Sequence, residues 1–426
     1  MGGKGGMRLR NRIAISVPFV LLVAAALFPF APGTAMCTEI SNTASRPAII
    51  LAWDNSGDFG PATPGTRTAG WQEALDACVE QKRDLYVKGG WGGRDAVYHV
   101  SETIRIPPTQ DFRIDGGVYV VNWTGPADRD LLVVDSGMDC HFSFGILVYG
   151  GNGAALRVRP EHPVPIDNFA AFVDSDIRVS SIADPRPFER GRREGGAGVV
   201  FDTEKASITH ADFSFTAVLN FATCIVAPDA GRGFTLNSVS CAHLHTNADS
   251  STLLDIGRQS RQNVFDMRIG VDQGAADVTG VRVRGRNNEL RVNTRGGFSD
   301  GRHVVFEESA SGNQLNLSHR DTVFIPEKFL TDRAVTPTNQ VTWAGAPPPI
   351  REIDGTAGEF VYVQRLFPAV LRIVGGNVSS VVLVRGDDHV SYPPATEREL
   401  VLSVGDTVRI TSTAPPRLTI IPVKMR

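Results

Sequence analysis

Three consecutive segments in the middle of the chain repeat one pattern: TLLDIGRQSRQNVFDMRIG (252–270), TGVRVRGRNNELRVNT (279–294) and RHVVFEESASGNQLNLSH (302–319). Each begins with a short apolar strand, continues through a polar turn and ends in a second strand of alternating residues. Asn263, Asn288 and Asn313 are the anchors of the pattern, each 25 positions after the last. A fixed period of this size, filled with strands, predicts a solenoid whose coils bury a core only by stacking.

The repeat extends toward the N-terminus through VVFDTEKASITHADFSF (199–215) and CIVAPDAGRGFTLNSVSC (224–241), and it stops after Phe324. The composition fits many short strands with tight turns, because the 426 residues include 43 glycines and only 8% aromatic residues. The formal charge is −3 and the Lys and Arg residues are scattered, which argues against nucleic acid as a partner.

The segment before the repeats contains the clearest helix pattern of the chain. In AGWQEALDACVEQ the residues Trp71, Ala74, Leu75, Cys78 and Val79 fall on one face at helical spacing. A strand and a Gly57-Asp58 turn precede this helix, and the segment Tyr98-His99-Val100-Ser101-Glu102-Thr103-Ile104 follows it. A helix in this place would cover the open end of the solenoid, with Trp71 as a core residue.

Together these features resemble the pectin-lyase-like superfamily of right-handed parallel β-helices, over roughly residues 49–324. The chain departs from that pattern before the helix, where Pro64-Gly65-Thr66-Arg67-Thr68 replaces the common Asp-Asp-Thr. The resemblance implies an all-β, right-handed parallel β-helix with an N-terminal capping helix, a polysaccharide as the partner, and a homotrimer as the assembly common among such proteins.

The two ends of the chain differ from the solenoid. Lys4, Arg8, Arg10 and Arg12 precede an apolar run and the small residues Gly33-Thr34-Ala35, so residues 1–35 are predicted to be a signal peptide. The alternatives are a retained membrane anchor or a lipid-modified Cys37. With the signal cleaved, the protein would be secreted, extracellular or periplasmic, without a membrane partner. We assign residues 36–330 to the β-helix with its cap, 331–350 to a linker and 351–426 to a small β-rich domain, an antiparallel sheet or sandwich.

Candidate functional residues come from aligning the second strand of each coil. Equivalent residues on successive coils lie about 4.8 Å apart and alternate between core and solvent. The alignment predicts an inward column of Phe142, Ile177, Phe213, Met267, Val292 and Leu317. Three outward columns flank it: His141, Asp176, Asp212, Asp266, Arg291 and Asn316; Ser143, Arg178, Ser214, Arg268, Asn293 and Ser318; and Asp139, Asp174, His210, Val264, Glu289 and Gln314. The coil with Phe234 needs a shift to fit, with Asn237 or Ser238 in the place of the aspartates.

Three aspartates in one outward column are unusual, since stacked like charges destabilise a sheet face. Asp176 and Asp212 on adjacent coils would stand about 5 Å apart, as in a retaining glycosidase, and Asp212 and Asp266 about 9–10 Å apart, near the range of an inverting one. The prediction is catalysis by Asp176, Asp212 and Asp266, with Arg178, Arg268, Arg291, Asn293, His210 and His141 binding the substrate. The alternative is that these aspartates pair with the arginines or bind a structural cation.

The sequence therefore predicts a polysaccharide-active enzyme, a glycoside hydrolase or transglycosylase that needs no cofactor or metal. A polysaccharide lyase, with Ca²⁺ as its cofactor, is the nearest alternative, and a non-catalytic glycan-binding surface protein is the other. The polygalacturonase pattern is missing from the coils, since the Asp-Asp pair Asp387-Asp388 lies in the C-terminal segment. His243 and His245 alternate on one strand and should share a face, where a hydrogen-bonded role competes with metal binding or proton donation.

Overall fold

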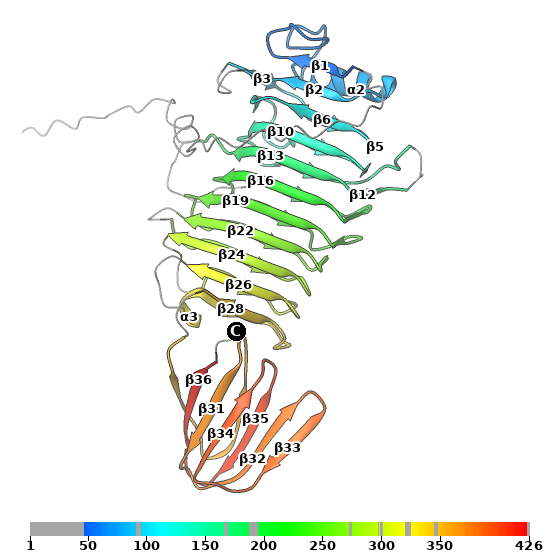
Figure 1. Cartoon of the computed structure of the whole chain (residues 1–426). Helices are drawn as coiled ribbons and strands as arrows, with labels where there is room; N and C mark the ends of the chain where they lie inside the picture. Colours follow the sequence, from blue (N-terminus) through cyan, green and yellow to red (C-terminus); the bar gives the residue numbers. More distant parts are fainter. Residues whose placement is uncertain are drawn as a thin grey trace, which may run out of the picture. The chain divides into compact units, whose positions relative to one another are not determined.

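The chain folds into a parallel β-helix followed by a small antiparallel β-sandwich, as a computed structural model shows (Figure 1). The structure describes residues 47–423 apart from 91–94, 166–168, 187–194, 272–274, 297, 299–300, 320–324 and 345–347. The fold class predicted from the sequence is confirmed. The signal peptide assigned to residues 1–35 lies outside the described residues and stays a prediction.

Three parallel sheets form the β-helix. Sheet A has the order β1 (Ile49–Ala52), β2 (Leu85–Lys88), β6 (Arg113–Gly116), β10 (His141–Val148), β13 (Asp176–Ala183), β16 (Asp212–Leu219), β19 (Ser238–Thr246), β22 (Val264–Val271), β24 (Glu289–Gly296), β26 (Gln314–His319) and β28 (Gln340–Trp343), with β3 (Val97–Val100) and β7 (Val120–Trp123) beside this path. Sheet B contains β4 (Ile104–Ile106), β8 (Leu132–Val134), β11 (Ala154–Val158), β14 (Ala197–Phe201), β17 (Thr223–Ala227), β20 (Thr252–Ile256), β23 (Thr279–Val283), β25 (Val304–Phe306) and β27 (Leu330–Asp332). Sheet C contains β5 (Thr109–Gln110), β9 (Gly137–Met138), β12 (Ala171–Val173), β15 (Ser207–Thr209), β18 (Phe234–Thr235) and β21 (Ser260–Arg261).

The predicted helix is α2 (Trp71–Gln81), and it buries one face against the first coils. Trp71 is 1% exposed, and its ring lies 5.8 Å from the ring of Tyr98 and 5.6 Å from that of Tyr119. Trp71 is thus a core residue, as expected. The prediction that Val79 lies on the buried face is wrong, because Val79 is 38% exposed on the last turn of the helix. Within the described residues, no helix is long and apolar enough to cross a membrane.

Stacked phenylalanines fill the core of the N-terminal coils. The ring of Phe213 lies 5.9 Å from that of Phe172 and 4.5 Å from that of Phe201, and the contacts continue to Phe234 and Phe265. All five side chains are fully buried. Aromatic pairs at these distances stabilise a fold beyond the area that they bury, by about 0.5–1.5 kcal/mol each.

A ladder of buried asparagines joins the C-terminal coils, and we call Asn237, Asn263, Asn288, Asn313 and Asn339 the asparagine ladder. In each step the backbone N–H and the side-chain amide of one asparagine donate to the Oδ1 atom of the next, at 2.9–3.1 Å. The same amide also donates to a backbone carbonyl oxygen of the preceding coil. The 25-residue spacing in the sequence is therefore the spacing of this ladder.

The residue before four of the five ladder positions, all except Asn339, has a left-handed backbone conformation. Gln262, Asn287 and Gly312 have φ angles of 57°, 54° and 65°, and the same turn in earlier coils holds Leu236 at 59°. Asparagine and glycine adopt this conformation readily, whereas it costs an ordinary residue about 1–2 kcal/mol. Leu236 is also 47% exposed, so little packing offsets its strain.

We therefore expect Leu236→Asn to raise the free energy of unfolding by about 1 kcal/mol. Chemical denaturation of the two proteins would measure the difference. Leu236→Ala is the matched control, because it removes the exposed apolar side chain and keeps the backbone strain. Equal stabilisation by both substitutions would show that the backbone is not the cause.

The solenoid continues further than predicted, which corrects the assignment of residues 331–350 to a linker. After the short helix α3 (Pro326–Phe329), β27 pairs with β25 in sheet B and β28 pairs with β26 in sheet A. Asn339 completes the ladder in this added coil. The solenoid continues because the period of the repeat persists: Asn339 follows Asn313 by 26 residues. The surrounding sequence is rich in proline and threonine, which makes this last repeat hard to recognise.

The C-terminal segment forms two four-stranded antiparallel sheets around their own apolar core. One sheet contains β29 (Arg351–Asp354), β36 (Arg417–Pro422), β31 (Ala369–Val374) and β34 (Glu397–Leu402). The other contains β30 (Gly358–Val363), β35 (Thr407–Ser412), β32 (Val378–Arg385) and β33 (Asp388–Tyr392). The predicted sandwich is thus confirmed, and its first strand begins at Arg351.

Candidate functional site

The outward face of sheet A brings together the two central residues of the predicted site. Asp176 on β13 and Asp212 on β16 are direct register partners on adjacent strands. Their Cα atoms are therefore about 4.8 Å apart, and both side chains leave the sheet on the same side. His141 on β10 and Arg113 on β6 extend this column by two strands. We call Arg113, His141, Asp176 and Asp212 the charged column.

The two carboxylates of the charged column differ in their surroundings. The Asp176 side chain is 17% exposed and lies 3.1 Å from His141 Nδ1, and its other oxygen is 3.8 Å from Arg178 Nε. The Asp212 side chain is exposed, and it forms no ion pair or side-chain hydrogen bond within the described part of the chain. The fold therefore orients one carboxylate through histidine and leaves its neighbour open to solvent.

Asp266 does not belong to the same column, which corrects the alignment made from the sequence. The register pairs Asp266 with Ser240, and through Ser240 with Ser214 and Arg178, two positions further along the strands. Two strand spacings and two residues of displacement separate the Cα atoms of Asp212 and Asp266 by about 12 Å. The pair predicted for an inverting mechanism is therefore not formed by these neighbours. Ser238 occupies the place next to Asp212, as one of the two expected residues.

The physical reason for this error lies in the asparagine ladder. Its position is held by Cys140, Ser175 and Ala211 in the earlier coils, so the marker that aligns the later coils is missing there. Ser175 still accepts the backbone N–H of Cys140, at 3.0 Å, but its side chain is not recognisable as a ladder member from the sequence. Without that marker, the outward columns slipped by two residues from Val264 onward.

The slip also changes the third predicted column. Val264, Glu289 and Gln314 lie in register with Asp212 through Ser238. The members of the third predicted column that lie in the earlier coils are not part of any strand. Asp139, Asp174 and His210 are turn residues with φ angles of 54°, 47° and 51°.

Most of the residues predicted to bind substrate have partners within the protein. Arg291 Nε donates to Glu289 Oε1 at 2.8 Å, and Asn293 Nδ2 donates to Ser318 Oγ at 2.9 Å. His210 Nδ1 lies 3.1 Å from the hydroxyl oxygen of Thr209. Arg268 is exposed on β22 and has no ion pair with any described residue. Only His141 and Arg178 among the predicted binding residues adjoin the Asp176–Asp212 pair.

Two further predictions concern histidines and metals. His243 and His245 share a face, since their rings stack with centroids 5.4 Å apart and an interplanar angle of 8°. Across the described ranges, no group of three His, Cys, Asp or Glu side chains is arranged to hold a metal ion.

Arg113 was missed by the sequence alignment, although the same alternation in DFRIDGG places it one coil before His141.

Comparisons with known proteins add little to this geometry. No family model matches the sequence. No curated protein matches it either. The fold and the charged face define a parallel β-helix protein, and solved structures of that kind show weak similarity.

Three of these structures are phage tailspike proteins. A tailspike protein of an Acinetobacter phage is 10% identical, with 88% of this chain and 87% of that chain covered and a TM-score of 0.24. The Dettilon tailspike protein is 6% identical, with 88% and 94% covered and a TM-score of 0.26. A mutant tailspike protein of E. coli bacteriophage HK620 in complex with pentasaccharide is 8% identical, with 88% and 94% covered and a TM-score of 0.27. Similarity this weak carries no argument about activity.

Proposed function

We propose that this protein binds a polysaccharide across the outward face of sheet A and cleaves its glycosidic bonds with Asp176 and Asp212. The supporting observation is the direct register of the two carboxylates on adjacent strands. Their backbone spacing of about 4.8 Å is close to the separation of about 5–5.5 Å between the carboxyl groups of retaining glycosidases. Strands joined on both sides hold such a pair more rigidly than loops would.

The surroundings of the two groups suggest their roles. Asp176 is oriented by His141 and is partly shielded, so it serves as the nucleophile that attacks the anomeric carbon. Asp212 is open to solvent and serves as the acid and base, protonating the leaving oxygen and then activating water. Arg178, which is mostly exposed beside the pair, would bind hydroxyl or carboxylate groups of the sugar chain.

The test is a panel of polysaccharides incubated with the full chain, followed by product analysis. We expect Asp212→Asn to lower turnover by about 10²–10⁴-fold on a natural glycan, and much less on an aryl glycoside whose leaving group needs no protonation. Asp176→Asn should lower turnover on both substrates. Asp266→Asn is the matched control and should leave turnover unchanged, because Asp266 lies outside the charged column. Wild-type turnover in Asp212→Asn would disprove the assignment.

A second candidate function is glycan binding without cleavage. It is favoured by the ion pairs of Asp176 with His141 and Arg178, which are also what a purely structural surface network would show. In that case no polymer of the panel would be cleaved, and Asp176→Asn and Asp212→Asn would still bind the glycan. A product that absorbs in the ultraviolet and depends on added calcium would instead identify a lyase.

The proposed location of the protein rests on its N-terminal segment, and its proposed oligomeric state rests on the resemblance to the pectin-lyase-like superfamily. We propose that residues 1–35 direct the protein out of the cytoplasm and that it meets its polysaccharide after export. We also propose that the protein assembles as a homotrimer. Sedimentation of the secreted protein, with sequencing of its mature N-terminus, would test both points.

A further inference from the structure

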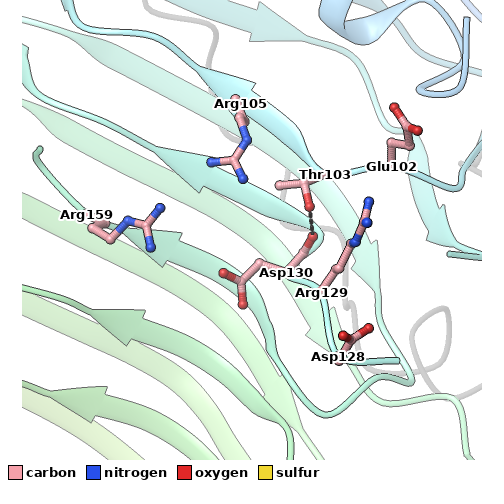
Figure 2. A pocket seen from close by; sticks show the side chains of 7 residues that line it. All are labelled: Glu102, Thr103, Arg105, Asp128, Arg129, Asp130 and Arg159. Atoms are coloured by element: carbon pink, nitrogen blue, oxygen red, sulfur yellow. Dashed lines mark hydrogen bonds between the residues drawn. The ribbon is translucent and has the colours of Figure 1, made fainter. Parts of the chain in front are cut away.

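A second candidate site lies on sheet B, on other strands than the charged column. A pocket of about 350 Å³ opens beside β4, at the segment before β8 and at the residue after β11. Figure 2 shows its lining, which consists of polar and charged side chains: Glu102, Arg105, Asp128, Arg129, Asp130 and Arg159, with Thr103 between them. The volume suits a single sugar ring or a similarly small ligand, at the lower end of the usual range of about 300–1,000 Å³.

Two of the carboxylates in this pocket are already neutralised by arginines outside it. Asp130 accepts hydrogen bonds from Arg157 at 2.7 and 3.1 Å, and the backbone N–H of Ala154 also donates to it at 2.7 Å. Glu102 forms an ion pair with Arg67 at 2.7 Å. These two groups keep lone pairs for hydroxyl donors but do not balance the charges of the pocket's own arginines.

The arginines of the pocket remain largely uncompensated. Neither Arg105 nor Arg129 forms an ion pair or a guanidinium hydrogen bond within the described part of the chain. The buried Nε of Arg159 makes no hydrogen bond to any residue that the structure describes, although a carboxylate oxygen of Glu161 lies 3.3 Å away. Asp128 is the one lining carboxylate without a described partner. The pocket therefore presents more guanidinium donors than the protein itself satisfies.

The position of Arg105 is fixed independently of its side chain. The backbone N–H of Arg105 donates to Gln72 Oε1 at 2.9 Å, and Gln72 Nε2 donates to the Arg105 carbonyl oxygen at 3.1 Å. Helix α2 thus holds this part of β4 in place through both backbone groups. A substitution of the guanidinium should leave the strand and the cap intact.

We propose that this pocket binds a sugar acid, a ring that carries a carboxylate and several hydroxyl groups. Two free guanidinium groups match a planar carboxylate, which they can bind through paired hydrogen bonds. Asp128, together with the remaining lone pairs of Asp130 and Glu102, accepts hydrogen bonds from the hydroxyl groups. This site is independent of the proposed cleavage on sheet A, and it would hold an acidic unit of a glycan or the free monosaccharide.

Titration calorimetry of the full chain with glucuronate, glucose and inorganic phosphate tests the proposal. Glucuronate should bind at least 10-fold more tightly than glucose or phosphate. Arg105→Gln and Arg129→Gln should each weaken glucuronate binding by about 10-fold or more, while the exposed Arg232→Gln is the matched control and should leave it unchanged. Circular dichroism would establish that the variants fold.

Three results would overturn the proposal: equal binding of glucose and glucuronate, phosphate binding as tightly as glucuronate, or unchanged binding in both arginine variants. Asp212→Asn should bind glucuronate as the wild type does, so a failure of the cleavage proposal would leave this one standing. An acidic oligosaccharide that binds far more tightly than glucuronate, with the same loss in Arg129→Gln, would identify a glycan unit as the ligand.

Discussion

Replacing Asn288 with alanine is expected to lower the free energy of unfolding by about 3–5 kcal/mol. Asn288 is 1% exposed and lies in the middle of the asparagine ladder. Its Oδ1 accepts the backbone N–H and the side-chain amide of Asn263, and its Nδ2 donates to Asn313 Oδ1 and to the carbonyl oxygen of Ser260. Alanine leaves the backbone N–H of Asn263 and one N–H of its side-chain amide without an acceptor in a buried place, at about 1–3 kcal/mol for each group, whereas the Ser260 carbonyl oxygen keeps the backbone N–H of Arg286.

Chemical denaturation would measure this loss. The matched control is Asn316→Ala on β26, because Asn316 is exposed and its loss should change stability by less than about 0.5 kcal/mol. Asn288→Ser should fall between the two, since a serine at the equivalent place of an earlier coil, Ser175, still accepts a backbone N–H. Equal stability of Asn288→Ala and Asn316→Ala would contradict the role assigned to the ladder.

The second large effect is a loss of stability in mild acid that depends on His303. His303 is 5% exposed between the rings of Phe298 and Phe329, whose centroids lie 4.4 and 4.5 Å away, and its Nδ1 has no hydrogen-bond partner among the described residues. Burial, with a smaller contribution from His319, lowers the pKa of His303 from 6.5 to about 3. The folded protein therefore keeps this ring neutral under conditions in which the unfolded chain protonates it.

The direction of the effect follows from proton binding. Between pH 6.5 and about 3 the unfolded chain binds one more proton at His303 than the folded chain, so stability rises with pH across this window. The contribution is complete above pH 6.5 and is lost as the pH falls, by about 2.5 kcal/mol between pH 7 and about pH 4.5. Denaturation curves at these two pH values would measure it.

His303→Phe keeps the aromatic contacts and removes the titrating group, so the variant should lose much less stability between the same two pH values. The control is His389→Phe on β33, where the histidine is exposed and its removal should leave the acid sensitivity of the protein unchanged. If His303→Phe were as acid-sensitive as the wild type, another group would be responsible.

The repeat made the fold predictable from the sequence, and the helix was predictable to its ends. A buried polar residue that must hydrogen-bond to its own copy one coil away has few substitutes, so Asn263, Asn288 and Asn313 stand out in the text. The buried face of α2 was clear at Trp71 and Leu75, which follow the helical period, but the same period wrongly included Val79 on the exposed last turn. A structural role that recurs in successive coils or helical turns produces a periodic pattern, and such a pattern can be recognised in a single sequence.

The site was predictable only in part, for reasons that lie in the same residues. Asp176 and Asp212 were placed together correctly because their coils share an alternating pattern of buried phenylalanine and isoleucine residues. Asp266 was misplaced because the ladder is interrupted at Ala211. The pocket on sheet B could not be predicted, because it depends on which of many arginines lack a partner, and only the three-dimensional positions of residues such as Arg67 and Arg157 decide that.

The two halves of the solenoid should respond differently to cooling. Phenylalanine contacts without the ladder hold the coils before Asn237, ladder hydrogen bonds join the coils after Phe265 as far as Asn339, and the coils between have both. Burial of apolar rings gives a large heat-capacity change on unfolding, and its contribution to stability weakens in the cold. The N-terminal coils should therefore become the first part to open near the freezing point of water, whereas heating should not favour their opening in this way. Although the protein is one continuous stack of coils, its lowest and its highest temperature of stability would then be set by different halves.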